Sequence, residues 1–278
     1  MPTDSSRIFS HPVLNIAHRG ARSLAPENTL AAARKALQVG AHMWELDVGM
    51  TLDGELIVVH DLTLDRTSNV KAIYPSRSPW RVHDFTLKEL QHLDFGSWFV
   101  EQDPFGEIAS GALSLQEAKT YQGEPVLTLQ DALTFTLEHD WLVNVEIKDL
   151  GNSHSESEIV YKVVSLVKDL NMADRVIISS FNHGYLECAR SLHTEVALGV
   201  LVSFPHPNPE ALVRKLGAQA YHPMLHTVTL HEISKLRQEG YHVLVWVAND
   251  EQTMRDLMDA GVSGLFTDFP QNLARIVS

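Results

Sequence analysis

The sequence predicts an α/β fold, a (β/α)₈ TIM barrel with a small insertion after the second strand. Three observations carry this prediction. Short runs rich in β-branched residues alternate with helical patterns along most of the chain, which is typical of βα units around a parallel sheet. Several helical patterns end on glycine, a common stop signal. A length of 278 residues is long for one ordinary domain but normal for a single barrel.

Eight candidate strands follow one another along the chain. They lie at residues 13–17, 43–48, 142–147, 175–180, 196–201, 218–221, 242–247 and 264–267. Helical patterns separate many of them, for example at 29–40, 128–140, 157–170, 230–240 and 251–261. Eight βα units of roughly 30 residues would close a barrel. An open doubly wound sheet is the alternative, but no glycine-rich nucleotide loop follows the first strand.

One long segment, at about 61–125, interrupts this alternation. Loops of that length are uncommon and are usually functional when they occur. We expect an inserted small subdomain with a hairpin, a short helix at 87–92 and aromatic packing within a single domain of residues 1–278. The aromatic side chains would be Trp80, Phe95, Trp98 and Phe99. A structural plug and a substrate lid are both compatible with this pattern.

Composition excludes several classes of protein. With 44% apolar residues the chain can bury a full core, and its formal net charge of -13 opposes binding to a nucleic-acid backbone. A single cysteine, Cys188, excludes an internal disulfide and is consistent with a reducing compartment. The first residues lack the basic start and apolar run of a secretory signal. No apolar run approaches the roughly 20 residues that span a bilayer, so we expect a cytoplasmic protein.

Three carboxylates stand at strand positions that face one way. Side chains alternate between the two faces of a strand, so Glu45 and Asp47 share a face, and Glu146 shares one with Lys148. In a parallel barrel the charged residues near carboxyl strand ends converge on the mouth, where active sites lie. Three clustered carboxylates resist joint ionisation unless a cation lies between them. Oxygen ligands of this kind suit one Mg²⁺ or Ca²⁺ ion.

Two histidines follow apolar runs at the same end of the predicted barrel. His18 and Arg19 come after the first strand, and His60 comes after the run LIVV. A histidine can carry a proton to a leaving group or from an attacking oxygen. Arg19 and Lys148 are the local cations that an acidic protein needs for an anionic ligand, although Arg19 could also orient Glu27 or brace the barrel.

Five motifs in order resemble the glycerophosphodiester phosphodiesterase family. They are HRGARSLAPENTLAA (18–32), GAHMWELDVGMTLDGELIVVHDLTLDRT (40–67), VEIK (145–148), YHVLVWVAN (241–249) and GLFTDFP (264–270). The resemblance covers nearly the whole chain. It implies a (β/α)₈ barrel with an insertion after the second strand, a divalent metal, and hydrolysis of glycerophosphodiesters to sn-glycerol 3-phosphate and an alcohol.

The resemblance also implies roles for individual residues. His18 and His60 would be the catalytic acid and base, and Glu45, Asp47 and Glu146 would be the metal ligands. Arg19 and Lys148 would contact the phosphate, and Trp246 and Phe181 would form the wall of the glycerol pocket. Glu27 and Asn28 would support these residues. The expected partner is a small glycerophosphodiester, with no nucleic acid and no stable membrane association. The sequence does not indicate which of the two histidines is the acid and which is the base. It also does not indicate the oligomeric state.

Two other functions remain open from the sequence. An enzyme on the same barrel could act on lipids, as a lysophospholipase D or a phosphatidylinositol-type phospholipase C, but no basic amphipathic helix supplies a membrane-facing rim. The second possible function is binding of phosphate esters without turnover, but the intact set of acids and histidines argues against it.

Overall fold

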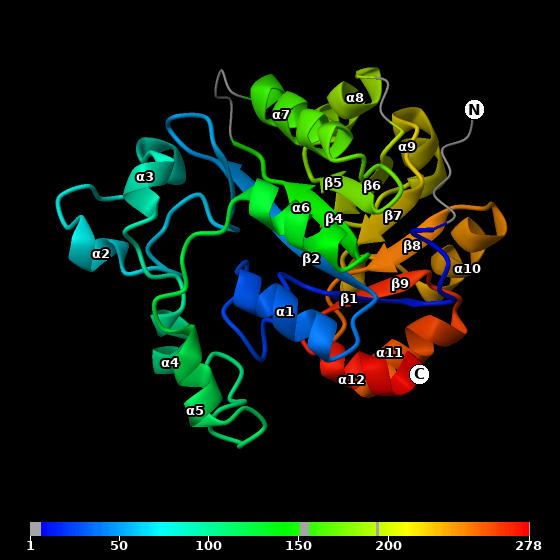
Figure 1. Cartoon of the computed structure of the whole chain (residues 1–278). Coiled ribbons are helices and arrows are strands. Elements are labelled where there is room, and N and C mark those ends of the chain that lie inside the picture. Colours follow the sequence, from blue (N-terminus) through cyan, green and yellow to red (C-terminus); the bar gives the residue numbers. More distant parts are fainter. Residues whose placement is uncertain (1–6, 151–155, 193–194, 278) are drawn as a thin grey trace.

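Eight parallel strands form a closed barrel, which confirms the predicted fold class (Figure 1). The structure, a computed structural model, describes residues 7–150, 156–192 and 195–277. The strands run in the order β1-β9-β8-β7-β6-β5-β4-β2, and pairing between β1 and β2 closes the ring. Their bounds are β1 (Leu14–Ala17), β2 (Met43–Met50), β4 (Leu142–Ile147), β5 (Val176–Ser180), β6 (Ala197–Val202), β7 (Ala220–Pro223), β8 (His242–Val245) and β9 (Gly264–Thr267).

Helices pack around the outside of the barrel, and polar residues define where they begin. The side chains of Thr29, Asn208 and Asp250 each accept a hydrogen bond from a backbone N–H three residues on, the usual start of a helix. The outer helices are α1 (Leu30–Gln38), α6 (Leu129–Glu138), α7 (Glu156–Asp169), α8 (His183–Ser191), α9 (Pro209–Leu216), the 3₁₀ turn η3 (Leu225–Thr227), α10 (Leu230–Gln238), α11 (Glu251–Asp259) and α12 (Pro270–Val277).

The alternation of side chains along each strand separates two cores. Inward-facing residues such as Ile16, Met43 and Leu244 form a small buried cluster inside the barrel. Outward-facing residues such as Trp44 and Leu46 belong to the larger cluster that packs against the helices. The Trp44 indole also donates a hydrogen bond of 2.9 Å to a threonine hydroxyl on α6. The parity inferred for β2 is therefore correct, and the residues of its other face point to the barrel axis.

A ninth strand, β3 (Leu56–Val58), runs antiparallel along β2. The chain turns back after β2, so that the backbone N–H of Val59 donates to the carbonyl of Asp47 at 2.9 Å. This return places His60 beside the carboxyl end of β2. The antiparallel strand therefore brings His60 and Asp61 close to Glu45 and Asp47.

The segment 61–125 consists of short helices and turns instead of the predicted hairpin. Every residue in it is described, and its β pairing is limited to an isolated bridge between Thr63 and Arg81. The side chains of Thr86 and Ser114 cap the N-termini of two short helices, so the segment forms helices where a hairpin was expected. The elements are α2 (Val70–Ile73), η1 (Val82–Asp84), α3 (Leu87–Leu90), α4 (Ser97–Gln102), α5 (Leu115–Ala118) and η2 (Lys119–Tyr121). Helix α3 occupies the first part of the predicted short helix.

The aromatic residues of this segment divide between two clusters. Phe95 and Trp80 pack with barrel-side residues such as Ile57 in a separate cluster. Trp98 and Phe99 join the main core, with ring centroids 6.0 Å apart in an edge-to-face contact. Figure 1 shows α2 to α5 beside the barrel, at the end toward which β2 runs. We propose that 61–125 is a subdomain within a single domain, because Trp98 and Phe99 belong to the main core and the separate cluster includes Ile57 of β3.

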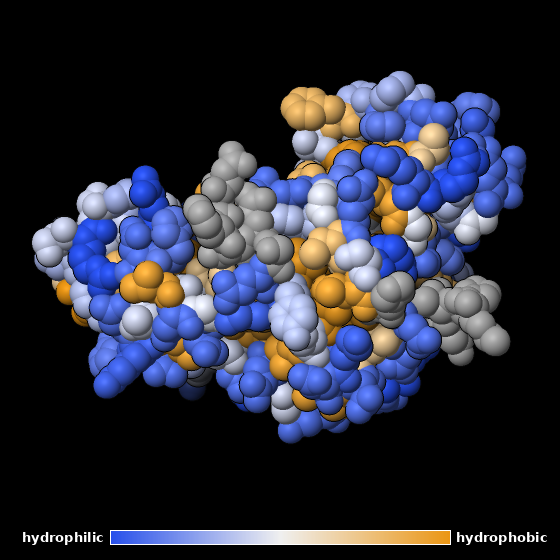
Figure 2. Space-filling view, turned by 90° about the horizontal axis from the view of Figure 1, so that it is seen from above, coloured by the Kyte–Doolittle hydropathy of each residue, from blue (hydrophilic) through white to orange (hydrophobic). Residues whose placement is uncertain are grey.

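The surface is mostly hydrophilic on the face drawn in Figure 2, with hydrophobic residues in small groups. Within the part of the chain that the structure describes, no helix has both the length and the apolar character needed to cross a membrane.

Candidate active site

A pocket opens at the carboxyl end of the barrel strands, where barrel active sites lie. It is a partly open cavity of about 470 Å³, a volume that includes the solvent space at its mouth. Its lining has a charged side and an apolar side. The residues are His18, Arg19, Glu45, His60, Asn144, Glu146, Lys148, Phe181, Leu201, Trp246, Val247 and Phe266.

Three carboxylates converge on the charged side of this pocket. Glu45, Asp47 and Glu146 each offer an oxygen, and these oxygens lie within 4.8 Å of one another. Adjacent parallel strands supply them, because Asp47 on β2 is in register with Glu146 on β4. All three are buried. Among the described residues, Oε1 of Glu45 has no hydrogen-bond partner, so this buried oxygen is available to a cation.

The HRG motif, residues 18–20, forms one wall of the acidic cluster through a backbone turn with positive φ angles. Arg19 and Gly20 both adopt positive φ angles, 54° and 78°. A Cβ atom at Gly20 would lie 2.6 Å from the Cβ of Ala32, so only glycine fits there. The turn directs the backbone N–H of Arg19 to Oε2 of Glu45 at 2.7 Å.

The PENT motif supports the cluster from the other side. Asn28, also at positive φ, donates from Nδ2 to Oδ2 of Asp47 at 2.8 Å and accepts from the Asp47 backbone N–H at 3.2 Å. The neighbouring Glu27 accepts from Arg19 at 2.9 Å. Asn28 therefore fixes the orientation of Asp47, and Glu27 fixes that of Arg19.

Buried cations balance part of the charge in the cluster. Nζ of Lys148 lies 2.6 Å from Glu146 and 3.4 Å from Asp47, and Nε of Arg19 lies 3.4 Å from Asp47. Burial would raise the pKa of Asp47, but Arg19 and Lys148 hold it below its usual range. Burial, together with the nearby Asp47 and Glu146, raises the pKa of Glu45. The protein thus holds more carboxylate here than its own cations neutralise, which favours a bound cation.

Each of the two histidines is paired with an aspartate through Nδ1. His18 lies 2.7 Å from Oδ1 of Asp268, which follows β9, and His60 lies 2.6 Å from Oδ1 of Asp61. Burial lowers the pKa of His18, while the hydrogen bond to Asp268 acts in the opposite direction. Because Nδ1 is engaged in both rings, Nε2 is the nitrogen left to face a ligand.

Aromatic side chains form the apolar side of the pocket. The rings of Phe181 and Trp246 meet edge to face with centroids 5.5 Å apart. The indole N–H of Trp246 donates to the carbonyl of His222 at 2.9 Å, which fixes the ring across the mouth. Trp246 continues the inward face of β8 beyond Leu244, as the strand parity predicts.

The structure brings all the sequence-predicted site residues together at the mouth. Most of them line the pocket directly, Asp47 belongs to the acidic cluster, and Glu27 and Asn28 border a smaller adjoining cavity together with His60. Their chemical roles stay predictions.

Sequence reasoning missed four charged residues that contact this set. They are Arg22, Asp61, Arg66 and Asp268. Strand parity could have found Asp268, since it lies two residues beyond the inward-facing Phe266. The other three lie in loops, for which the sequence offers no comparable periodic signal.

The fold and the site define a (β/α)₈-barrel hydrolase with a candidate divalent-cation centre. The chain belongs to the glycerophosphoryl diester phosphodiesterase family, whose model matches residues 18–272. It is therefore an enzyme, a phosphoric diester hydrolase of the glycerophosphodiester phosphodiesterase type, from a family that depends on divalent metals.

Curated relatives and solved structures agree with this assignment. A glycerophosphodiester phosphodiesterase of Caldanaerobacter subterraneus is 32% identical over 95% of this chain and 97% of its own. One from Bacillus altitudinis is also 32% identical, over 94% and 96%. An Oleispira antarctica phosphodiesterase, solved with its product sn-glycerol 3-phosphate, matches with a TM-score of 0.81 and 28% identity, covering 98% of each chain.

Proposed function

We propose that this enzyme hydrolyses small glycerophosphodiesters, such as glycerophosphocholine or glycerophosphoethanolamine, to sn-glycerol 3-phosphate and an alcohol. One observation carries the proposal: an acidic cluster, two aspartate-paired histidines and two buried cations share a single pocket. The product bound by the Oleispira antarctica relative supports this choice of substrate. The preference for an aqueous metabolite fits a cytoplasmic location, which we also propose.

Glu45, Asp47 and Glu146 would hold one Mg²⁺ or Ca²⁺ ion. The fit rests on the convergence of three carboxylate oxygens and on the unpartnered Oε1 of Glu45 among the described residues. These hard oxygen donors suit either cation. When bound, the cation would polarise a phosphate oxygen and offset the charge that develops at phosphorus.

The two histidines would act as the general acid and the general base of the reaction. With Nδ1 held by an aspartate, each ring presents Nε2 as a donor or an acceptor. One of His18 and His60 takes the proton of the attacking oxygen, and the other gives a proton to the departing alkoxide. Both rings line the pocket that contains the acidic cluster, so both can reach a phosphodiester placed there.

The remaining pocket residues would bind and orient the substrate. Arg19 and Lys148 place positive charge beside the acidic cluster, where it can balance the phosphoryl group. Phe181 and Trp246 form an apolar wall against which the glycerol backbone can pack. In this arrangement the phosphate lies on the charged side of the pocket and the carbon chain on the apolar side.

The test is hydrolysis of glycerophosphocholine, with released glycerol 3-phosphate coupled to a dehydrogenase. We expect turnover that a chelator abolishes and that Mg²⁺ or Ca²⁺ restores. The double variant Glu45→Ala, Asp47→Ala should lose at least about 100-fold in kcat. Glu251→Gln, which alters an exposed ion pair on α11, is the matched control and should retain full activity. If the wild type showed no more turnover than the double variant across a panel of head groups, the proposal would be wrong.

One observation favours a second candidate, a phosphodiesterase directed at lipids. Phe181 is 40% exposed and Phe204 is 78% exposed, and they follow the neighbouring strands β5 and β6 at the mouth. A lysophospholipid could extend its acyl chain over such side chains. Faster turnover of lysophosphatidylcholine than of glycerophosphocholine, with the difference removed by Phe204→Ser, would select this candidate.

A further inference from the structure

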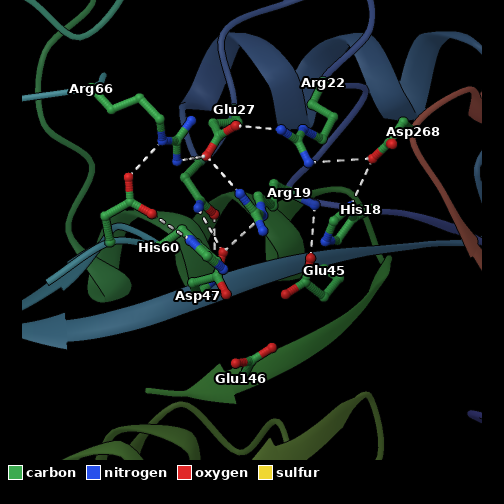
Figure 3. Close-up of polar contacts among 12 residues, drawn as sticks. His18, Arg19, Arg22, Glu27, Glu45, Asp47, His60, Arg66, Glu146 and Asp268 are labelled. Carbon is green, nitrogen blue, oxygen red and sulfur yellow. Dashed lines mark hydrogen bonds and ion pairs between the residues drawn. The ribbon is translucent and has the colours of Figure 1, made fainter. Parts of the chain in front are cut away.

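A continuous chain of charged contacts connects the two candidate catalytic histidines (Figure 3). Its centre is Glu27, which is 5% exposed. On one side, Nη2 of Arg22 donates to Oε2 of Glu27 at 2.8 Å, and Nη1 of Arg22 lies 3.5 Å from Oδ1 of Asp268, the partner of His18. In the other direction Arg66 is 2.7 Å away through its own Nη2. Each histidine thus has an aspartate, each aspartate has an arginine, and both arginines meet at one carboxylate.

Arg66 reaches this chain from the inserted segment 61–125. Its Nε donates to Oδ2 of Asp61 at 2.5 Å, while Oδ1 of Asp61 lies 2.6 Å from Nδ1 of His60. The two arms of the guanidinium therefore hold two carboxylates at once, one at the surface of the insertion and one buried in the barrel. A planar guanidinium fixes such a geometry, whereas an ammonium group acts as a single point charge.

Asp61 depends on Arg66 for its orientation. Burial would raise the pKa of Asp61, but its hydrogen bonds to His60 and Arg66 hold it well below its usual range. Between them, these two partners account for both carboxylate oxygens of Asp61. Without Arg66 the carboxylate could rotate toward solvent, because the Asp61 side chain is 27% exposed.

We propose that Arg66 is a positioning residue for the hydrolysis: it holds Asp61 against Nδ1 of His60, and so keeps Nε2 of His60 directed at the substrate. This inference rests on the proposed proton-transfer role of His60. Arg66 itself does not line the pocket. Its effect should therefore fall on the rate of the chemical step and not on substrate affinity.

The experiment compares Arg66→Gln with the wild type in the glycerophosphocholine assay. We expect kcat to fall about 10- to 100-fold, as for other residues that orient a reacting side chain, with KM within about twofold of wild type. Arg66→Lys should recover only part of the loss, because one ammonium cannot hold both carboxylates in the same plane. Since the Arg66 side chain is 40% exposed, added ethylguanidinium should raise the kcat of Arg66→Ala.

A matched control separates positioning from simple support of the insertion. Arg77, also in the insertion, pairs with Glu89 at 2.6 Å and stacks on Phe85. Arg77→Gln should lower the melting temperature of the protein without lowering kcat. Nitrogen NMR of the His60 ring gives a second readout: the proton should be fixed on Nδ1 in the wild type and shared between the two nitrogens in Arg66→Gln.

The outcomes are distinguishable from failure of the proposed function. A wild type without turnover would reject the function and leave the NMR comparison as the test of Arg66. A wild type with turnover, together with an Arg66→Gln variant of equal kcat and an unchanged His60 tautomer, would overturn the inference. A rise in KM alone would make Arg66 a phosphate contact instead, and an equal loss of kcat in Arg77→Gln would make it a structural brace.

Discussion

Replacing Glu27 by glutamine tests how much stability one buried carboxylate contributes. Its oxygens accept hydrogen bonds from Arg19, Arg22 and Arg66. Burial alone would raise the pKa of Glu27, but the three guanidinium groups lower it from 4.5 to about 2. At about 1.4 kcal/mol for each pKa unit, this lowering corresponds to roughly 3 kcal/mol of stability. We expect Glu27→Gln to lower the free energy of unfolding at pH 7 by roughly that amount.

The loss should depend on pH in a defined direction. Because the pKa of Glu27 is lower in the folded chain, the unfolded chain takes up the proton first as the pH falls. The contribution of Glu27 is therefore complete above pH 4.5 and disappears as the pH approaches 2. The difference between wild type and variant should narrow across that window.

Urea unfolding followed by circular dichroism at neutral and at successively lower pH measures both effects. The matched control is Glu210→Gln, which removes an exposed pair with Arg214 one turn along α9 and should cost less than about 0.5 kcal/mol. Equal unfolding midpoints for Glu27→Gln and the wild type at pH 7 would refute the reasoning. A difference that stayed constant down to pH 2 would assign the loss to packing and not to charge.

Two further predictions follow from the site. Gly20→Ala should lower the free energy of unfolding by more than about 2 kcal/mol, because it adds a contact of 2.6 Å with Ala32 to the cost of a positive φ. The control is Gly106→Ala, since Gly106 has a φ of 71° but open space around it. In thermal melts this control measures the backbone cost alone, and its loss of stability should be smaller. Asp268→Asn should reduce kcat about 10- to 100-fold, because it weakens the partner of His18. It should also lower the melting temperature, because the pKa of the Asp268 carboxyl is lowered to about 2 in the folded chain. An unchanged kcat in steady-state assays would show that this pairing does not serve catalysis.

The periodicity of the sequence predicted the barrel and much of the site for a simple physical reason. A strand has a period of two, so the inward direction of Met43 also fixes that of Glu45 and Asp47. The same rule places Trp246 beyond Leu244 at the mouth. Regular strands carry this information from one residue to the next, which is why the acidic cluster was visible before the structure.

The rest could not be predicted because it depends on contacts between distant, irregular segments. Strand parity could indicate that Asp268 faces inward but not that it pairs with His18, because the two residues are 250 positions apart in the sequence. The hairpin expected in 61–125 was wrong because apolar residues there serve short capped helices, as at Thr86 and Glu89. The arginines around Glu27 come from two loops, where neither period applies.

The contacts of the insertion bear on whether it is a plug or a lid. It sends Arg66 to Glu27 and Asp61, and it places the ring of Phe105 5.2 Å from the guanidinium of Arg22. A plug would contribute apolar packing alone, and a lid would contact the substrate side of the pocket. This segment contributes apolar packing and also contacts the charged groups behind both histidines, so under the proposed roles of His18 and His60 a change in its position would alter proton transfer without any contact with the substrate. If the proposed proton-transfer roles hold, the insertion supports the catalytic residues in addition to packing against the barrel.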